Sequence, residues 1–428
     1  MNKLKFPTRL AVLFAVIAAA GLPGVYERIV HEHMNTAAPQ SAPWGLWIAA
    51  YTFFSGISAG AFPIAALSFV FGQRRFRPLA RLALLTALVG LASAMIFVMV
   101  DLGRPEKSFH SFWTPNFSSM MTYVVLGYVA YGGLLAFLLW FTLRPEWAAQ
   151  SAASGGLITR LLAFGWKDTE KQHRRDDLIL RVAGVAGLAL CLGLAEGVGS
   201  LFSVLGGRSF WHSGLFPVTF LVSALLSGSS FVLAAAALLG RGGHQFKNTL
   251  LTLARFIGLL LVVELIILPT ETLIVLKGGI PSHIEVLRAI ATGRFAWVFW
   301  IVQFGLGTLA ATLLIMVPKR QTLTLAATAA LLVLVGIFAF RLNFVIPQQA
   351  PSIAPLIAEL PLHAGDDYVP NYYEWNLVIF GIGFAGLAFL AGFRWLPILS
   401  AGSPMEFELA AHSRRPPVDA TTAATHPV

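Results

Sequence analysis

The five residues Asp101-Leu102-Gly103-Arg104-Pro105 place a carboxylate and a guanidinium in one short turn stiffened by glycine and proline. This turn follows an apolar run of membrane-spanning length, 78–100, in which Arg81 is the only charged residue. Ionisable groups at a membrane boundary can exchange protons or bind a polar substrate. A helix end closed by a tight turn would explain the same residues without any chemistry. The surrounding residues favour the functional interpretation.

Three glutamates inside apolar runs are candidates for proton transfer. Glu196 lies within 179–202, whereas Glu264 and Glu271 lie within 250–276. The spacing of Glu264 and Glu271 places them on roughly the same face of a helix. Because ionisable side chains inside a membrane are usually functional, we expect all three to contribute to a proton path. Each could instead be a buried carboxyl that hydrogen-bonds to a neighbouring helix and transfers nothing.

Ring-bearing and hydrogen-bonding side chains gather at the ends of the apolar runs on the Asp101 side. They are Trp44, Trp47, Tyr51, His110, Asn116, Ser118, Ser119, Tyr123, Trp211 and His212. Tryptophan and tyrosine at such positions often form only an interfacial belt. Together with Asp101 and Arg104, however, these groups would suit a quinone pocket. The apolar tail of a quinone lies in the bilayer, its two carbonyls need donors, and aspartate or histidine can exchange its protons.

The composition predicts an all-α integral membrane protein. Of the 428 residues, 57% are hydrophobic and 12% are charged, and the mean hydropathy is +0.74; soluble domains are about a quarter charged. Ten apolar runs could cross a bilayer as helices: 10–26, 44–71, 78–100, 119–143, 179–202, 214–240, 250–276, 295–317, 322–345 and 375–396. The first follows a basic start and could alternatively be the core of a cleaved signal peptide.

The basic residues orient these spans. When the amino terminus is placed in the cytoplasm, most of the 30 lysines and arginines fall on the cytoplasmic side. This predicts that both termini are cytoplasmic and that the Asp101 turn faces outward. The formal net charge of +10 is then mainly an insertion signal, and we expect no nucleic-acid partner.

Redox cofactors are difficult to place in this protein. Its single cysteine, Cys191, excludes a self-contained iron–sulfur cluster, a cysteine zinc site and an intrachain disulfide. The ten histidines lie in loops, in tails or at the edges of spans, where they cannot hold a haem between facing helices. We find no P-loop, dinucleotide fingerprint or nucleophile triad. The sequence therefore predicts no haem, no iron–sulfur cluster and no metal.

A weak internal repeat suggests how the spans are grouped. The segment 44–104 resembles 216–276, so that Phe54-Ser55-Gly56-Ile57-Ser58 matches Leu226-Ser227-Gly228-Ser229-Ser230. Small residues on packed helices would also produce this similarity. The repeat predicts two parallel four-helix bundles, 44–202 and 203–345, with a cytoplasmic linker at 144–178. The remaining predicted parts are an N-terminal helix with an outer loop (1–43), an outer loop with the last helix (346–402) and a disordered tail (403–428).

Several of these segments resemble the NrfD/polysulfide-reductase membrane-subunit family. They are Trp44-Gly45-Leu46-Trp47-Ile48, Phe54-Ser55-Gly56-Ile57-Ser58-Ala59-Gly60, the Asp101–Pro105 turn and Phe117-Ser118-Ser119-Met120. Arg341, the long outer loop, Glu374-Trp375 and Leu396-Pro397-Ile398-Leu399 resemble its larger ten-span branch. That branch includes membrane subunits of hydrogenase-2-type and sulfur-metabolism complexes. The resemblance covers most of 40–400.

This resemblance implies a cofactor-free subunit of the bacterial cytoplasmic membrane that reacts with menaquinone or ubiquinone. It also implies an extracytoplasmic four-cluster ferredoxin-like iron–sulfur partner, which connects the quinone to a molybdopterin, nickel–iron or haem catalytic subunit. The matching motif makes Asp101 and Arg104 the quinone-site residues, with His110 and Tyr123 as looser assignments. Some family members move protons and others do not, and Glu196 and Glu264 leave both outcomes open.

The sequence therefore predicts a ten-helix quinone-reactive subunit of a respiratory or sulfur-metabolism complex. In this interpretation Asp101 exchanges protons, Arg104 orients or charges the site, and Tyr51, Ser119, His110 and Tyr123 line it. The long outer segment 346–373 would be a docking surface for the partner. Two alternatives are a secondary transporter, whose repeats are often inverted, and a passive membrane anchor.

Overall fold

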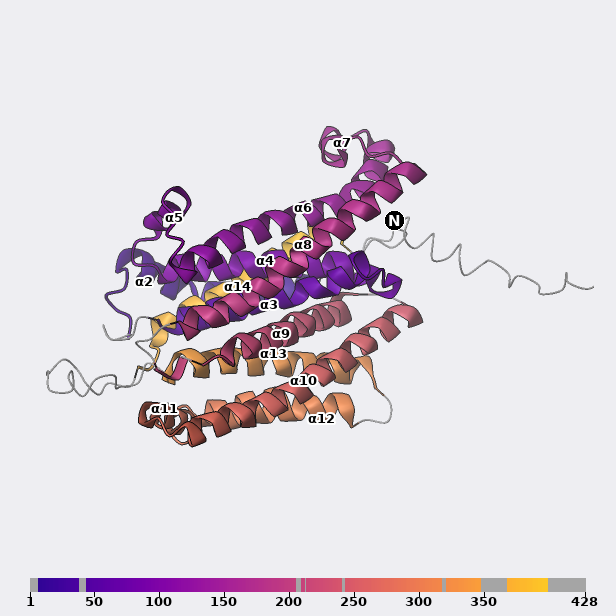
Figure 1. Ribbon diagram of the computed structural model, residues 1–428. Coiled ribbons are helices and arrows are strands. Elements are labelled where there is room, and N and C mark those ends of the chain that lie inside the picture. Colours follow the sequence, from indigo (N-terminus) through magenta and orange to yellow (C-terminus); the bar gives the residue numbers. More distant parts are fainter. Residues whose placement is uncertain are drawn as a thin grey trace, which may run out of the picture.

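Long helices make up most of the described protein, because a backbone surrounded by lipid must satisfy its own hydrogen bonds. The computed structural model describes residues 7–37, 44–204, 209–211, 213–240, 243–317, 321–347 and 368–398, and it contains no strand within these ranges. Ten helical segments in them are long and apolar enough to cross a membrane. This result confirms the predicted all-α membrane class and the number of spans (Figure 1).

The helices follow the predicted spans, with some differences at their ends. They are α1 (Thr8–Ala20), α2 (Leu22–Val30), α3 (Leu46–Phe69), α4 (Arg77–Asp101), α5 (His110–Trp113), α6 (Met120–Ser154), α7 (Leu157–Ala163), α8 (Glu170–Ser203), α9 (Phe216–Leu239), α10 (His244–Gly278), α11 (Pro281–Ala291), the π-helix η4 (Val298–Ala310), α12 (Ala311–Met316), α13 (Leu323–Val345) and α14 (Tyr372–Trp395). The first span is divided into α1 and α2 at Gly21. The segment 144–178 contains the end of α6, all of α7 and the start of α8.

Helix α3 lies at the centre of the bundle and packs against α4, α8, α9, α13 and α14. In Figure 1, α4, α6 and α8 lie on one side of it and α9, α13, α10 and α12 on the other. The α3 and α9 backbones touch, since a Cβ on Gly228 would lie 2.1 Å from the carbonyl carbon of Gly60. Such close contact is available only to glycine. The parallel repeat and the division into two four-helix bundles stay predictions.

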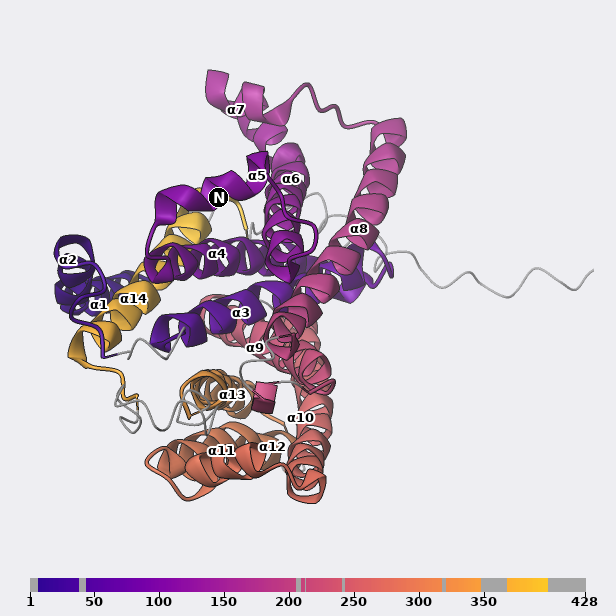
Figure 2. The same cartoon turned by 60° about the vertical axis from the view of Figure 1, so that its left-hand side comes forward.

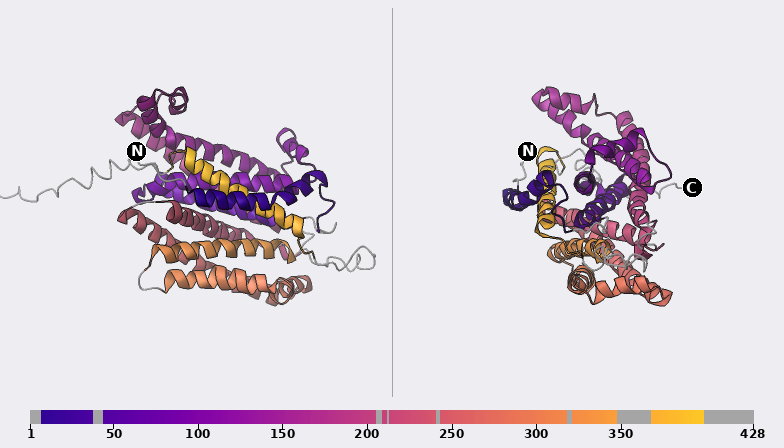
Figure 3. Two further views of the ribbon diagram at one scale, coloured as in Figure 1. Left: turned by 180° about the vertical axis from the view of Figure 1, so that it is seen from behind. Right: turned by 90° about the vertical axis from the view of Figure 1, so that its left-hand side faces the viewer.

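Helices α1 and α14 pack side by side although they are far apart in the sequence, as the view from behind shows (Figure 3). Glycines allow the close approach: a Cβ on Gly383 would lie 2.4 Å from the backbone nitrogen of Ala18. A Cβ on Gly24 of α2 would similarly lie 2.5 Å from the backbone nitrogen of Leu377. Helix α14 therefore fixes α2 near the end of α4.

The two ends of the bundle carry different elements. We call the end at which α4 stops the Asp101 end; α2, α5 and α11 lie there, whereas α7 lies toward the opposite end (Figure 1). Figure 2 brings the Asp101 end forward. Three sequence predictions fall outside the described residues. They concern His212, most of the proposed docking segment 346–373 (348–367) and the tail 403–428.

Candidate functional site

The carboxyl end of α4 is capped by side chains from another part of the protein. Arg28 donates from Nε to the carbonyl of Val100 (2.7 Å) and from Nη2 to that of Leu102 (2.9 Å). The carbonyl of Asp101, between them, accepts a hydrogen bond from Nε2 of His33 (3.1 Å). The last carbonyls of a helix have no partner within it, and cations stabilise this end of the helix dipole. Three consecutive carbonyls are thus held by α2 and the loop after it.

The surroundings of His33 favour its neutral form. Burial lowers the pKa of its imidazole, and the nearby Arg28 guanidinium lowers it further. Because Nε2 meets a carbonyl oxygen, which can only accept, the proton of the neutral ring lies on Nε2. The ring of His33 also packs against that of Trp47, with centroids 5.5 Å apart.

A second set of hydrogen bonds surrounds Glu374 at the start of α14. Its Oε1 accepts from the hydroxyl of Tyr368 (2.6 Å), and its Oε2 accepts from the backbone nitrogens of Asn371 (2.8 Å) and Ala37 (3.3 Å). The Asn371 side chain accepts from the nitrogen of Glu374 (3.1 Å), which completes a capping box. The Tyr368 hydroxyl also accepts from the nitrogen of Leu46 (3.0 Å), so these bonds join α14 to the start of α3. Burial and the Glu374 carboxylate raise the pKa of Tyr368.

These two sets meet around Asp101. Its carboxyl lies within electrostatic range of both Arg28 and Glu374. The indole nitrogen of Trp47 donates to the carbonyl of Glu374 (3.3 Å), while its ring contacts His33. We call Arg28, His33, Asp101 and Glu374 the Asp101 cluster. Sequence reasoning selected Asp101 for it but did not select Arg28 or His33, which come from a different helix and loop.

Four other predicted site residues lie outside the Asp101 cluster. Arg104 and His110 are exposed, and Tyr123 is 55% exposed and packs against Phe117. Ser119 precedes α6 without capping it through its side chain. Within the described part of the sequence, no hydrogen bond or ring contact connects these four side chains with Asp101.

Tyr51, the remaining predicted pocket residue, belongs to a buried polar group among the helices. Its hydroxyl lies 2.9 Å from that of Tyr128, which in turn lies 2.6 Å from Oγ of Ser55. All three side chains are buried. Tyr51 and Ser55 are one turn apart on α3, so this face of the helix carries the hydrogen-bonding groups.

Arg341 of α13 lies beside this group and is only 1% exposed. Its Nη2 donates to Oγ of Ser223 (2.6 Å), and its guanidinium carbon lies 3.8 Å from the ring centroid of Phe220. Nε and Nη1 have no hydrogen-bond partner among the described residues. Both Tyr51 and Tyr128 lie within electrostatic range of the guanidinium. An arginine with unused donors in this setting can hold a negative charge or ordered water.

Two of the predicted glutamates extend this polar group toward the Asp101 end. Glu264 lies within electrostatic range of both Arg341 and Glu271. Glu271 accepts a hydrogen bond from Thr219 of α9 (2.5 Å). We call Tyr51, Tyr128, Arg341, Glu264 and Glu271 the embedded polar cluster. Glu196, by contrast, is exposed on α8.

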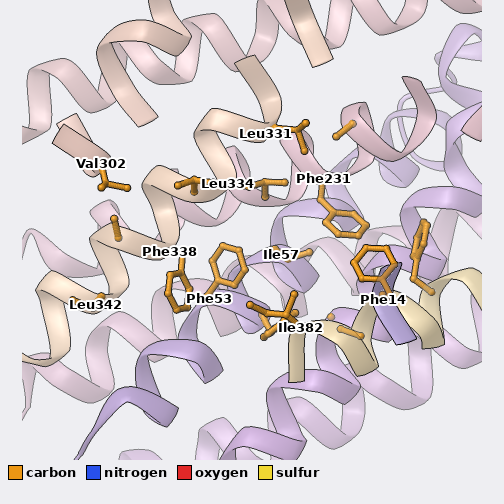
Figure 4. A pocket seen from close by; sticks show the side chains of 18 of the residues that line it. Phe14, Phe53, Ile57, Phe231, Val302, Leu331, Leu334, Phe338, Leu342 and Ile382 are labelled. Carbon is orange, nitrogen blue, oxygen red and sulfur yellow. The ribbon is translucent and has the colours of Figure 1, made fainter. Parts of the chain in front are cut away.

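An apolar fissure of about 690 Å³ opens on the opposite face of α3 from Tyr51 and Ser55. Its walls come from α1, α3, α4, α9, η4, α13 and α14, and they include Phe14, Phe53, Phe231, Val302, Phe338 and Ile382 (Figure 4). One wall residue, Phe54, stacks on Phe97 of α4 (5.6 Å between centroids). Phe97 is one turn before Asp101 on the same helix. Phe97 and one helical turn thus separate the wall of the fissure from Asp101.

Within the described ranges, no group of three or more histidine, cysteine or carboxylate side chains lies close enough together to hold a metal ion. Cys191 is buried on α8 as a free thiol.

Comparison with known proteins gives the family context of these features. The family model described as "Polysulphide reductase, NrfD" matches residues 34–352. The sequence is 30% identical to a selenate reductase subunit from Mesobacillus selenatarsenatis, over 91% of this protein and 93% of that one. It is 25% identical to the integral membrane subunit of menaquinone reductase from Nitratidesulfovibrio vulgaris (95% and 94%) and 24% identical to a polysulfide reductase subunit from Wolinella succinogenes (72% and 94%).

Proposed function

Because the chain belongs to the NrfD polysulphide reductase family, we propose that it is the quinone-reactive membrane subunit of a larger oxidoreductase. The relatives named above are subunits of selenate, polysulfide and menaquinone reductases. The observation that carries the proposal is the Asp101 cluster together with the apolar fissure, whose wall residue Phe54 stacks on Phe97, one turn before Asp101. Such a pair of surfaces suits a molecule with a polar head and a long apolar tail.

The residues of the Asp101 cluster have separate roles in this proposal. Asp101 exchanges protons with the quinone head, because its carboxyl lies within electrostatic range of the positive Arg28 and the negative Glu374. Arg28 and His33 position Asp101 by holding the end of α4. The quinone supplies the redox chemistry, and the protein supplies binding, orientation and proton exchange. The exposed Arg104 lies where it can meet a partner subunit or orient the incoming head.

The electrons are exchanged with a docked partner. We propose an extracytoplasmic iron–sulfur subunit at the Asp101 end, attached to a separate catalytic subunit. The support is the set of relatives, which are named as subunits of reductases, and the position of the Asp101 cluster at one end of the bundle. With the orientation given by the basic residues, this end is outside a bacterial cytoplasmic membrane and both termini are inside.

The embedded polar cluster is the proposed route for protons. It leads from Glu271 and Thr219 through Glu264 to Arg341. Ionisable groups at this depth are expensive to bury, and they commonly mark proton relays. We leave Glu196 out of this route because its side chain is exposed on α8.

Binding of a fluorescent quinol-site inhibitor to the purified protein tests the proposal. Saturable binding is expected for the native protein and should weaken at least tenfold in Asp101→Asn, which keeps the shape of the side chain but cannot ionise. Glu196→Gln, a matched change on the exposed face of α8, should bind as the native protein does. Equal binding by both variants would remove Asp101 from the site. Absence of binding by a folded native protein, with or without its partner subunits, would favour a transporter or a passive anchor.

A further inference from the structure

Helix α7 carries an apolar face that the described residues leave largely exposed. Leu157, Ile158 and Leu161 are 70%, 73% and 67% exposed, and Phe164, directly after the helix, is 75% exposed. Their spacing places them on one side of the helix. The opposite side packs inward through the buried Ala163. Four large apolar side chains in one patch on a short helix need a partner that removes them from water.

The position of α7 along α6 indicates what that partner is. Gly155 ends α6 with φ of +66°, which allows the backbone to reverse. Helix α7 then packs back against α6, where the indole nitrogen of Trp140 donates to the carbonyl of Leu162 (3.1 Å). The rings of Trp140 and Phe164 are also in contact, with centroids 6.1 Å apart. Figure 1 accordingly shows α7 beside α6 and not beyond its end.

This contact sets the depth of α7 in the membrane. Trp140 comes about 20 residues after the start of α6 at the Asp101 end. At about 1.5 Å per residue it lies roughly 30 Å along the helix, which matches the thickness of the hydrocarbon layer. Trp140 is therefore at the far boundary of the bilayer, and α7 lies beside it at the same level. A water-soluble protein could reach this side-facing patch only by entering the headgroup layer.

The charged residues near the patch are arranged for the same environment. Arg160 and Lys167 are exposed and flank the apolar face. Two nearby acidic side chains are paired within the segment: Asp168 pairs with His173, and Glu170 pairs with Arg174. A helix with an apolar face and flanking cations is typical of segments that lie at the membrane interface.

We propose that α7 is a membrane-surface anchor whose apolar face enters the lipid leaflet opposite the Asp101 end. Arg160 and Lys167 then lie among the phosphate headgroups of that leaflet. The anchor holds the projecting ends of α6 and α8 at a fixed height above the bilayer. This proposal is independent of the quinone proposal, since it uses none of the residues of the Asp101 cluster or the embedded polar cluster.

Spin-label accessibility in phospholipid vesicles tests the anchor. The full-length protein with Cys191→Ala receives a single cysteine, Leu161→Cys on the apolar face or Lys171→Cys on the exposed start of α8, and each is labelled with a nitroxide. Collisions with oxygen, which concentrates in lipid, are compared with collisions with a water-soluble nickel chelate. We expect oxygen to dominate at position 161 and the nickel chelate to dominate at position 171.

The other possible results would overturn the proposal. Dominance of the nickel chelate at position 161 would place the patch in water. A label there that neither reagent reaches would show that a protein surface, and not lipid, covers the patch. Repeating the measurement with Ile158→Cys guards against a local disturbance at one site, because Ile158 belongs to the same exposed face.

Discussion

Replacing Arg28 tests whether the Asp101 cluster depends on a cap supplied from outside α4. Arg28→Met removes both donors to Val100 and Leu102 but keeps an apolar stem of similar length. A hydrogen bond from a charged donor contributes about 1.5–3 kcal/mol, and the lower figure applies because Arg28 is half-buried. Loss of both bonds should therefore lower the free energy needed to open the end of α4 by about 3 kcal/mol. This change raises the equilibrium constant for opening roughly 100-fold.

Amide hydrogen exchange of the peptide ending at Leu102 measures this opening directly. The Leu102 nitrogen donates the last hydrogen bond of α4, to the carbonyl of Val98 (3.1 Å), so its protection reports the end of the helix. Arg28→Lys should lose about one bond, and thus roughly tenfold in protection, because an ammonium cannot reach both carbonyls in the same way.

Arg104→Met provides the control, because it removes an exposed arginine close in sequence to the same helix end. Its exchange should match that of the native protein. If Arg28→Met and Arg104→Met exchange alike, the hydrogen bonds of Arg28 do not hold α4, and the positioning role assigned to this residue is wrong.

Burial lowers the pKa of His33 from its ordinary value of 6.5, so below that pH the folded protein binds fewer protons than the unfolded protein. The contact between α2 and α4 should therefore weaken as the pH falls through 6.5 and stay constant above it. Hydrogen exchange of 31–37 measures this dependence, and His33→Gln should abolish it. In the assembled complex, Glu264→Gln should retain quinol oxidation but lose the coupled movement of protons across the vesicle membrane, whereas Glu196→Gln should retain both. If the two variants move protons equally well, the proposed route is wrong. Gly228→Ala should destabilise the folded protein by about 1–3 kcal/mol or more, since the new Cβ would lie 2.1 Å from the α3 backbone. Gly133→Ala, with open space at its Cβ, should be neutral or stabilising by up to about 1 kcal/mol in the same detergent melting experiment.

The ten spans could be predicted because the requirement that lipid imposes is local. A run of about 20 apolar residues is visible in sequence without knowledge of its neighbours. The predicted ends of the spans differ from the observed helix ends where a helix continues past its apolar run. In 144–178, for example, α6 and α8 extend through charged residues for which hydropathy gives no signal. The π-helical backbone of η4 was also invisible, because π and α hydrogen bonding use similarly apolar sequences.

The candidate site could be predicted only in part, because several of its residues are far apart in the sequence. Asp101 was identifiable from its own turn, and Glu264 and Glu271 from their shared helix face. Arg28 and His33 could not be assigned to Asp101, because nothing in the local pattern shows that α2 packs near the end of α4. Arg341 was named only as part of the family resemblance, and its hydrogen bond to Ser223 joins residues far apart in sequence.

The packing of α2 against α14 has a consequence for the order in which the protein matures. During synthesis α2 and α4 emerge early, but the surface that holds α2 in place, around Leu377, is made only after almost all other described residues. Glu374 and Tyr368 emerge at the same late stage. A ribosome-bound polypeptide that stops before α14 would thus contain Asp101 without its finished surroundings. The hydrogen bonds around Glu374 and the support of α2 by α14 can therefore form only after α14 has been translated.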